Sequence, residues 1–142
     1  MGSYSMNDHF LPFVNKDDYN FSVNIIKEII NSLKKEGIIY KGVIYGQFMI
    51  TKNGPKVIEI NARFGDPEAM NVLSILDGNF LDIIKQMAEG MLKNNFRFRN
   101  VSTVVKYIVP IGYGINPKAG DEISIDEERI KRTGSRIYYG SV

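Results

Sequence analysis

The sequence predicts an α+β fold with antiparallel sheets. Apolar residues recur at helical spacing over residues 17–36, and two β-rich runs, residues 40–50 and 56–61, flank an Asn-Gly turn. A turn of this kind joins two strands antiparallel. Two further helical patterns and several short β-rich runs follow.

The composition excludes several kinds of chemistry. With 142 residues, of which 44% are hydrophobic and 24% charged, the chain has the size and composition of one globular domain. It contains no cysteine, which excludes disulfides, thiolate zinc sites, iron–sulfur clusters and a cysteine nucleophile. The single histidine, His9, argues against an imidazole metal site or a serine–histidine triad.

Charge and hydropathy argue against nucleic-acid and membrane partners. The chain has 18 basic and 16 acidic residues, so its formal net charge is +2 and gives no electrostatic basis for a dedicated nucleic-acid or membrane-surface binder. No apolar run approaches the roughly 20 residues that span a bilayer. The first residues lack the pattern of a signal peptide, so a cytoplasmic location is expected.

The first predicted element is an amphipathic helix. Residues 1–14 are expected to be loop or extended chain. The helix is predicted from Asp17 to Glu36, with Asn15 or Asp17 as its N-cap and Gly37 at its end.

A hairpin follows, with strands predicted at Tyr40–Ile50 and Lys56–Asn61. If residues 52–54 form a three-residue loop with Gly54 left-handed, Gln47 falls opposite Glu59. A two- or four-residue loop would place Gln47 on the other face, because a shift of one residue reverses the side chains of a strand.

The second hairpin strand carries the candidate metal-binding residues. Alternation predicts Val57, Glu59 and Asn61 on one face, and Ile58 and Ile60 on the buried face. A carboxylate and an amide oxygen on a rigid strand suit Mg²⁺, with waters and substrate phosphates completing the coordination sphere. The alternative is a polar strand face that is simply solvated.

The loop after this strand adds a candidate anion-binding residue. Arg63 directly follows the predicted metal face and has the geometry to bind a phosphate or carboxylate bidentately. Asp66 is expected to cap a helix that begins at Pro67. The alternative is a capped helix start beside an ordinary surface arginine.

The remaining pattern predicts short elements. Helices are expected at residues 67–76 and 80–88, and strands at residues 96–99, 101–109, 122–125 and 136–139, with a helical turn within residues 126–132. The composition changes near residues 93–100, which predicts a subdomain boundary there. The loop-like start and the strand-like end lead us to expect a piece of a longer protein.

The segment around the candidate site carries a family resemblance. It reads Glu59-Ile60-Asn61-Ala62-Arg63-Phe64-Gly65-Asp66-Pro67-Glu68. This segment closely resembles the signature of the phosphoribosylamine–glycine ligase family, also called glycinamide ribonucleotide synthetase, whose members have the ATP-grasp fold. The likeness extends outward over essentially the whole chain. Many family members continue with Thr-Gln where this chain has Ala69 and Met70, so any role of those two polar residues is lost.

The resemblance implies a function and a set of roles. In this family ATP, glycine and 5-phosphoribosylamine give ADP, phosphate and glycinamide ribonucleotide, a step of purine synthesis. The resemblance implies that Glu59 and Asn61 hold Mg or Mn ions of the nucleotide and that Arg63 acts at the transferring phosphate. Gln47 lies where many ATP-grasp enzymes place a third metal ligand, commonly Glu, so it is the third metal candidate.

The resemblance also implies a domain assignment. Residues 1–95 are expected to be the second lobe of an ATP-grasp domain, and residues 96–142 the beginning of a small β-rich domain. The family's amino-terminal substrate domain and first ATP-grasp lobe have no counterpart in the chain, so the chain alone is expected to be inactive. It is also expected to self-associate through the surface that the missing portion would cover. The alternatives are another ATP-grasp carboxylate–amine ligase and a non-catalytic fragment that binds a metal or a partner.

Overall fold

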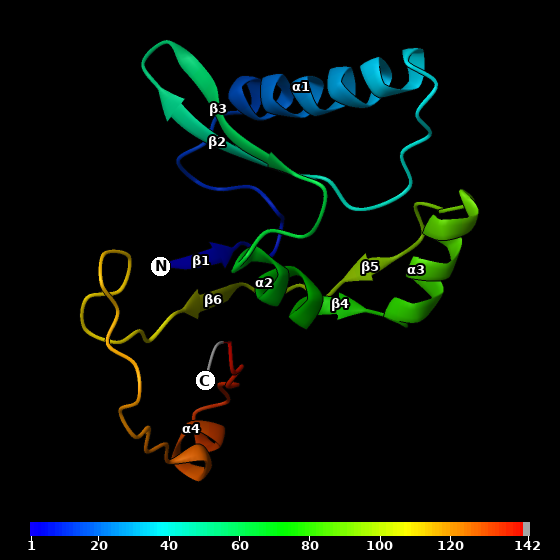
Figure 1. The fold of residues 1–142 in the computed structure, drawn as a ribbon. Helices are drawn as coiled ribbons and strands as arrows, with labels where there is room; N and C mark the ends of the chain where they lie inside the picture. The colour runs from blue at the N-terminus through cyan, green and yellow to red at the C-terminus, as the bar shows by residue number, and fades with distance from the viewer. Residues whose placement is uncertain (141–142) are drawn as a thin grey trace. The chain divides into compact units, whose positions relative to one another are not determined.

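The computed structural model describes residues 1–140 and shows short antiparallel sheets and helices, as the predicted α+β class requires (Figure 1). The chain divides into two compact units, Met1–Tyr107 and Ile108–Val142. The division lies after residues 93–100, where the change in composition predicted a subdomain boundary, because strands from residues 97–106 pair within the first unit. Among the described residues no helix is long and apolar enough to cross a membrane.

The predicted amphipathic helix is present as α1, Lys16–Lys35. Of the two candidate caps, Asn15 is the one used: its side chain accepts a hydrogen bond from the Asp18 backbone N–H at 2.8 Å. The helix ends before Gly37, whose φ of 80° suits the left-handed conformation common after helices. Both predicted boundaries are therefore confirmed to within one residue.

The hairpin comprises β2, Tyr45–Thr51, and β3, Gly54–Asn61. Thr51 pairs with Gly54, so the turn contains two residues, Lys52 and Asn53, and is the shorter of the loops considered, not the three-residue loop. Gly54 is left-handed, with a φ of 83°. The Thr51 hydroxyl fixes the turn, because it donates to the Gly54 carbonyl at 2.8 Å.

A β-bulge in β3 then changes the register. Phe48 pairs with Val57, but the neighbouring Gln47 pairs with Glu59, which leaves Ile58 as the extra residue. The bulge compensates for the short turn and places Gln47 opposite Glu59 after all. It also overturns the prediction that Val57 shares the face of Glu59, and Ile58 is 53% exposed where burial was expected.

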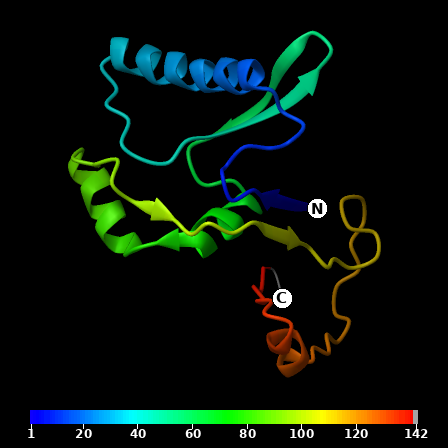
Figure 2. The ribbon, with the colours of Figure 1, turned by 180° about the vertical axis from the view of Figure 1, so that it is seen from behind.

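Helix α1 packs on one face of this hairpin, as both views of the ribbon show (Figures 1 and 2). A Cβ at Gly46 would lie 2.6 Å from Ile26 of α1, 2.8 Å from the Phe48 ring and 3.3 Å from Ile60. These contacts identify the face toward α1. We call the opposite face the outer face of the hairpin; the register assigns to it Tyr45, Gln47, Met49, Lys56, Glu59 and Asn61.

The first residues, expected to be loop or extended chain, include a strand. Strand β1, Gly2–Ser5, pairs antiparallel with β6, Thr103–Lys106, and helix α2, Glu68–Ile75, contacts both strands. Asn71 of α2 is 2% exposed; it accepts from the Ser3 hydroxyl at 3.0 Å and donates to the Thr103 carbonyl at 3.1 Å. With Ile75, 1% exposed, it forms the best-buried part of the described chain.

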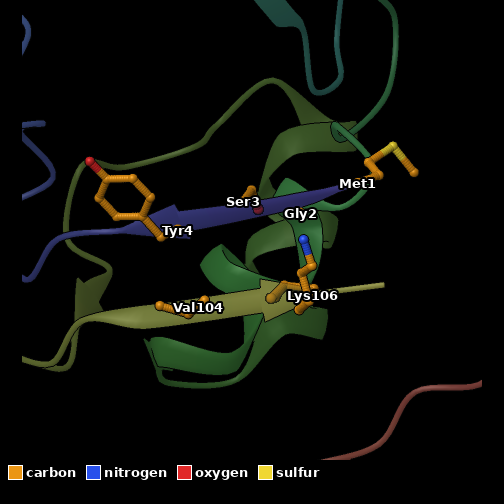
Figure 3. A pocket seen from close by; sticks show the side chains of 7 residues that line it. Met1, Gly2, Ser3, Tyr4, Val104 and Lys106 are labelled. Carbon is orange, nitrogen blue, oxygen red and sulfur yellow. The ribbon is translucent and has the colours of Figure 1, made fainter. Parts of the chain in front are cut away.

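The face of the β1–β6 ribbon that carries Tyr4 and Val104 holds a shallow depression lined by residues 1–4 and 104–106 (Figure 3). Val104 is 79% exposed there. Lys106 supplies the only ionisable side chain besides the Tyr4 phenol. The depression therefore has no cluster of groups that would perform chemistry.

The other short elements of the first unit largely follow the sequence pattern. Strand β4, Leu76–Asp77, pairs with β5, Arg97–Phe98, and helix α3, Phe80–Glu89, is capped by Asn79 and ends at a left-handed Gly90. The strand predicted over residues 101–109 is present as β6, but it is shorter and covers only Thr103–Lys106.

The second unit contains α4, Glu127–Arg132, capped by Asp126, which confirms the predicted helical turn. The strands predicted at residues 122–125 and 136–139 are absent from the described part of this unit. A β-rich run becomes a strand only when another strand supplies hydrogen bonds, and residues 108–140 offer it none. Tyr139 instead donates its hydroxyl to Glu127 at 2.6 Å.

Candidate functional site

The outer face of the hairpin brings the three predicted metal candidates together. Gln47 and Glu59 are direct cross-strand partners, and Asn61 is two residues further along β3 on the same face. The Asn61 side chain donates from Nδ2 to Glu59 Oε1 at 2.9 Å. Gln47 and Glu59 are exposed and Asn61 is half-buried, so the three side chains lie at the surface of the hairpin.

The chemistry of this donor set fits a hard divalent cation. One carboxylate and two amide oxygens are ligands that Mg²⁺ and Mn²⁺ accept, and they leave positions for waters and phosphate oxygens. Asn61 would have to turn its amide so that Oδ1 replaces Nδ2 beside the cation. Among the described residues no three His, Cys, Asp or Glu side chains gather into a metal site, so amide oxygens are needed to complete this one.

Arg63 lies in the loop after β3 with an exposed side chain. Its Nη1 donates to the Phe64 carbonyl at 2.8 Å, and within residues 1–140 it has no ion pair with a carboxylate. Most of its five donors are therefore free to bind an anion. The structure places Arg63 next to the metal candidates in the chain but shows no contact between its guanidinium and Glu59.

The prediction that Asp66 caps the next helix is wrong. Helix α2 begins at Glu68 with Pro67 in the cap position and no side-chain cap. The Asp66 carboxylate instead accepts a hydrogen bond from the Tyr107 hydroxyl. The helix begins one residue later than expected, and a partner 41 residues away cannot be foreseen from the local sequence.

Sequence reasoning missed a second layer of residues behind the site. Tyr45 shares the outer face with Gln47, and Gly65 and Glu68 lie against it: a Cβ at Gly65 would be 2.5 Å from Glu68 Oε2 and 3.0 Å from the Tyr45 ring. Glu68 Oε2 is buried and has no hydrogen-bond partner. The position of Tyr45 two residues before Gln47 was the available signal, since alternation places both on one face.

The electrostatics of this layer are unusual for a half-buried tyrosine. Burial, then the charge of the Glu68 carboxylate and its interaction with the phenol, and then the charge of Glu59 raise the pKa of Tyr45 to about 12. The neutral phenol is thus favoured, because the charges of both carboxylates oppose its ionisation.

Comparison with known proteins agrees with the family resemblance. Residues 1–69 match the family model described as the phosphoribosylglycinamide synthetase ATP-grasp (A) domain. The chain is 51% identical over 143 residues to the phosphoribosylamine–glycine ligase of Methanocaldococcus jannaschii. It is 50% identical over 145 residues to that of Pyrococcus abyssi and 49% identical over 142 residues to that of Thermococcus kodakarensis.

These alignments cover 100% of this chain but only 32–33% of the relatives. The chain therefore spans about a third of the length of the curated relatives that it matches. Identity of about one half along the entire chain, together with the ATP-grasp match over its first 69 residues, confirms the resemblance seen in residues 59–68. Along its whole length the chain is therefore similar to a part of the phosphoribosylamine–glycine ligases, and over residues 1–69 it is similar to their ATP-grasp domain.

Proposed function

We propose that this chain supplies the metal-binding part of an ATP-dependent ligase that joins glycine to 5-phosphoribosylamine and forms glycinamide ribonucleotide. The observation that carries the proposal is the gathering of Gln47, Glu59 and Asn61 on the outer face of the hairpin. The activity for which its relatives are named supports the choice of reaction. Because the chain spans a third of those relatives, their remaining length is proposed to supply the rest of the site.

Each residue has a defined task in this proposal. Glu59, Asn61 and Gln47 hold Mg or Mn through oxygen atoms, and the bound cation would neutralise charge on the phosphates of ATP. Arg63 stabilises charge on the phosphoryl group as it moves to the carboxylate of glycine and on the acyl phosphate that results. The amine of phosphoribosylamine then displaces phosphate from the carbonyl carbon, helped by being held close to it.

The domain assignment is part of the same proposal. Residues 1–95 are assigned to the second ATP-grasp lobe and residues 96–142 to the start of a β-rich domain. The family match over residues 1–69 and the packing of α1 against the β2–β3 hairpin support the first assignment. A cytoplasmic location is proposed because ATP and the purine intermediates are small polar molecules of that compartment.

The test is complementation. We would measure ADP formation that depends on glycine and phosphoribosylamine, for this chain alone and for the chain mixed with a separately made amino-terminal portion of the enzyme. We call this mixture the complemented protein. It is expected to turn over, and Glu59→Ala is expected to abolish the reaction because the carboxylate ligand is lost. Glu28→Ala on α1, which removes an exposed carboxylate without an ion pair, is the matched control.

The outcomes separate the alternatives. Turnover by the chain alone would contradict the need for the remaining length. Turnover with other carboxylate and amine substrates, but not with glycine and phosphoribosylamine, would indicate a different ATP-grasp ligase. A complemented protein that folds but forms no ADP would leave a non-catalytic fragment that binds a metal or a partner.

A further inference from the structure

The bulge in β3 assigns one more side chain to the outer face. In a regular strand Lys56 would lie on the face opposite to Glu59, because the two residues are three positions apart. With Ile58 as the extra residue, Lys56 pairs with Met49, and Met49 is two positions from Gln47 on β2. The outer face therefore carries a cation as well as the three candidate metal ligands.

The Lys56 side chain is long enough to reach a ligand bound beside the Gln47–Glu59 pair. Two residues along a strand span about 7 Å, which is the separation of the Met49–Lys56 pair from the Gln47–Glu59 pair along the hairpin. A lysine carries its ammonium group at the end of a flexible four-carbon stem. The ammonium can therefore meet a ligand that lies over Glu59 without any movement of the backbone.

Nothing within residues 1–140 occupies the Lys56 ammonium. The side chain is exposed and takes part in no ion pair or hydrogen bond. Lys41, by comparison, already donates to the Ala88 carbonyl at 3.1 Å. Helix α1 covers the other face of the hairpin, and the register places Lys56 on the exposed outer face instead.

We propose that Lys56 is a phosphate-binding residue of the outer face, which contacts a phosphate group of a substrate held beside Gln47, Glu59 and Asn61. This inference rests on the proposed function and deepens it. A phosphate anchored by a divalent cation keeps further negative oxygens, and a lysine ammonium is a compact point charge suited to them. Both a nucleotide polyphosphate and the phosphate of a phosphoribosyl group present this chemistry.

The test compares two lysines of the same hairpin in the complemented protein. Lys56→Met removes the ammonium and keeps an unbranched stem, and Lys52→Met does the same in the turn, which is not part of the ladder. Calorimetry would measure the binding of Mg–ADP and, separately, of ribose 5-phosphate, at low and at high salt. Steady-state kinetics would give KM and kcat for both substrates that carry phosphate.

Loss of one charge-assisted contact is expected to weaken binding roughly tenfold for Lys56→Met, with a smaller salt dependence, while Lys52→Met binds like the unaltered protein. Lys56→Arg is expected to restore most of the affinity. A loss confined to Mg–ADP identifies the nucleotide as the source of the phosphate, and a loss confined to ribose 5-phosphate identifies the phosphoribosyl substrate.

Equal binding of both ligands by Lys56→Met and Lys52→Met would overturn the inference. If Glu59→Ala still abolishes nucleotide binding in that case, the proposed function stands without Lys56. If Glu59→Ala also binds and turns over normally, the proposed function fails and the role of Lys56 fails with it.

Discussion

Gly65 and Glu68 are packed closely: a Cβ at position 65 would lie 2.5 Å from Glu68 Oε2, so any side chain there requires Glu68 to move. The backbone reinforces the contact, because the Ala69 N–H donates to the Gly65 carbonyl at 2.9 Å. The loop that carries Arg63 is therefore folded back onto the first turn of α2. This packing fixes how the candidate anion-binding loop leaves β3, the strand that carries Glu59 and Asn61.

Gly65→Ala is expected to force Glu68 or the Tyr45 ring to move and to destabilise the protein by about 1–3 kcal/mol. Denaturant unfolding followed by circular dichroism would measure the change. Gly42→Ala is the matched control, since its new Cβ meets the Tyr40 side chain at 3.5 Å, an ordinary contact. Equal stability of the two variants would show that Glu68 and Tyr45 move to accommodate the new Cβ at little cost in free energy.

The Tyr45 phenol is expected to make stability depend on alkaline pH. Its pKa is raised to about 12 from an ordinary value of 10, so the folded state holds the proton more tightly than the unfolded state. The stabilisation is complete below pH 10 and is lost as the pH rises to about 12.

The measurement is urea unfolding of the metal-free chain at several pH values across this window. Tyr45→Phe is expected to flatten the loss of stability in this range. Tyr19→Phe on α1 controls for the removal of one exposed tyrosine. A Tyr45→Phe profile that matches that of the unaltered chain would refute the assignment.

Gln47→Glu is expected to tighten the binding of Mn²⁺, because it sets a second carboxylate directly opposite Glu59. Without the cation the same change places two like charges on a cross-strand pair and lowers stability by roughly 0.2–1 kcal/mol. Calorimetric titration with Mn²⁺ and thermal unfolding in a chelator would measure the two effects. Gln86→Glu on α3 is the control, and weaker Mn²⁺ binding by Gln47→Glu would argue against a cation on this face.

Asn71→Leu is expected to destabilise the first unit by about 1–3 kcal/mol, because it leaves the buried Thr103 carbonyl and the Ser3 hydroxyl without their partner. Asn7→Leu is the comparison, since the Asn7 side chain is exposed and bonds only to Asn100. Thermal unfolding would compare the two variants. A similar small effect of both would mean that α2 is held to β1 and β6 by apolar contacts alone.

The chain alone is expected to self-associate. Several large apolar side chains are mostly exposed, among them Ile39 at 80%, Leu81 at 73%, Val104 at 79% and Phe13 at 65%. Light scattering would detect particles larger than the monomer, and the complemented protein should scatter less per unit mass than an aggregate of the chain. A monodisperse monomer at all concentrations would contradict this expectation.

Local signals in the sequence were sufficient for the ends of α1 and α3, though not for the cap of α2. Asn15, Gly37, Asn79 and Gly90 mark helix ends, and each lies at or next to the observed end. A cap acts over three or four residues, so its signal is contained in the segment that it ends. The hairpin and its left-handed Gly54 were predictable for the same reason.

Long-range structure and register were not predictable in this way. The correct opposition of Gln47 and Glu59 was expected from a three-residue loop, yet it arises from a shorter turn followed by a bulge at Ile58. No residue within β3 marks the position of this bulge. Likewise Asp66 accepts a hydrogen bond from Tyr107, and β1 pairs with β6. Both partners lie far along the chain.

The pairing of β1 with β6 has a consequence for synthesis of the chain. Ser5 and Thr103 face each other across this ribbon, with their hydroxyl oxygens 2.8 Å apart, yet they are separated by 98 residues. At about 5–20 residues per second a ribosome needs roughly 5–20 s to make that stretch. During this time the β1 segment has no strand to pair with, while α1 and the hairpin need only nearby residues. Helix and hairpin are therefore complete first, and the ribbon beneath α2 closes last.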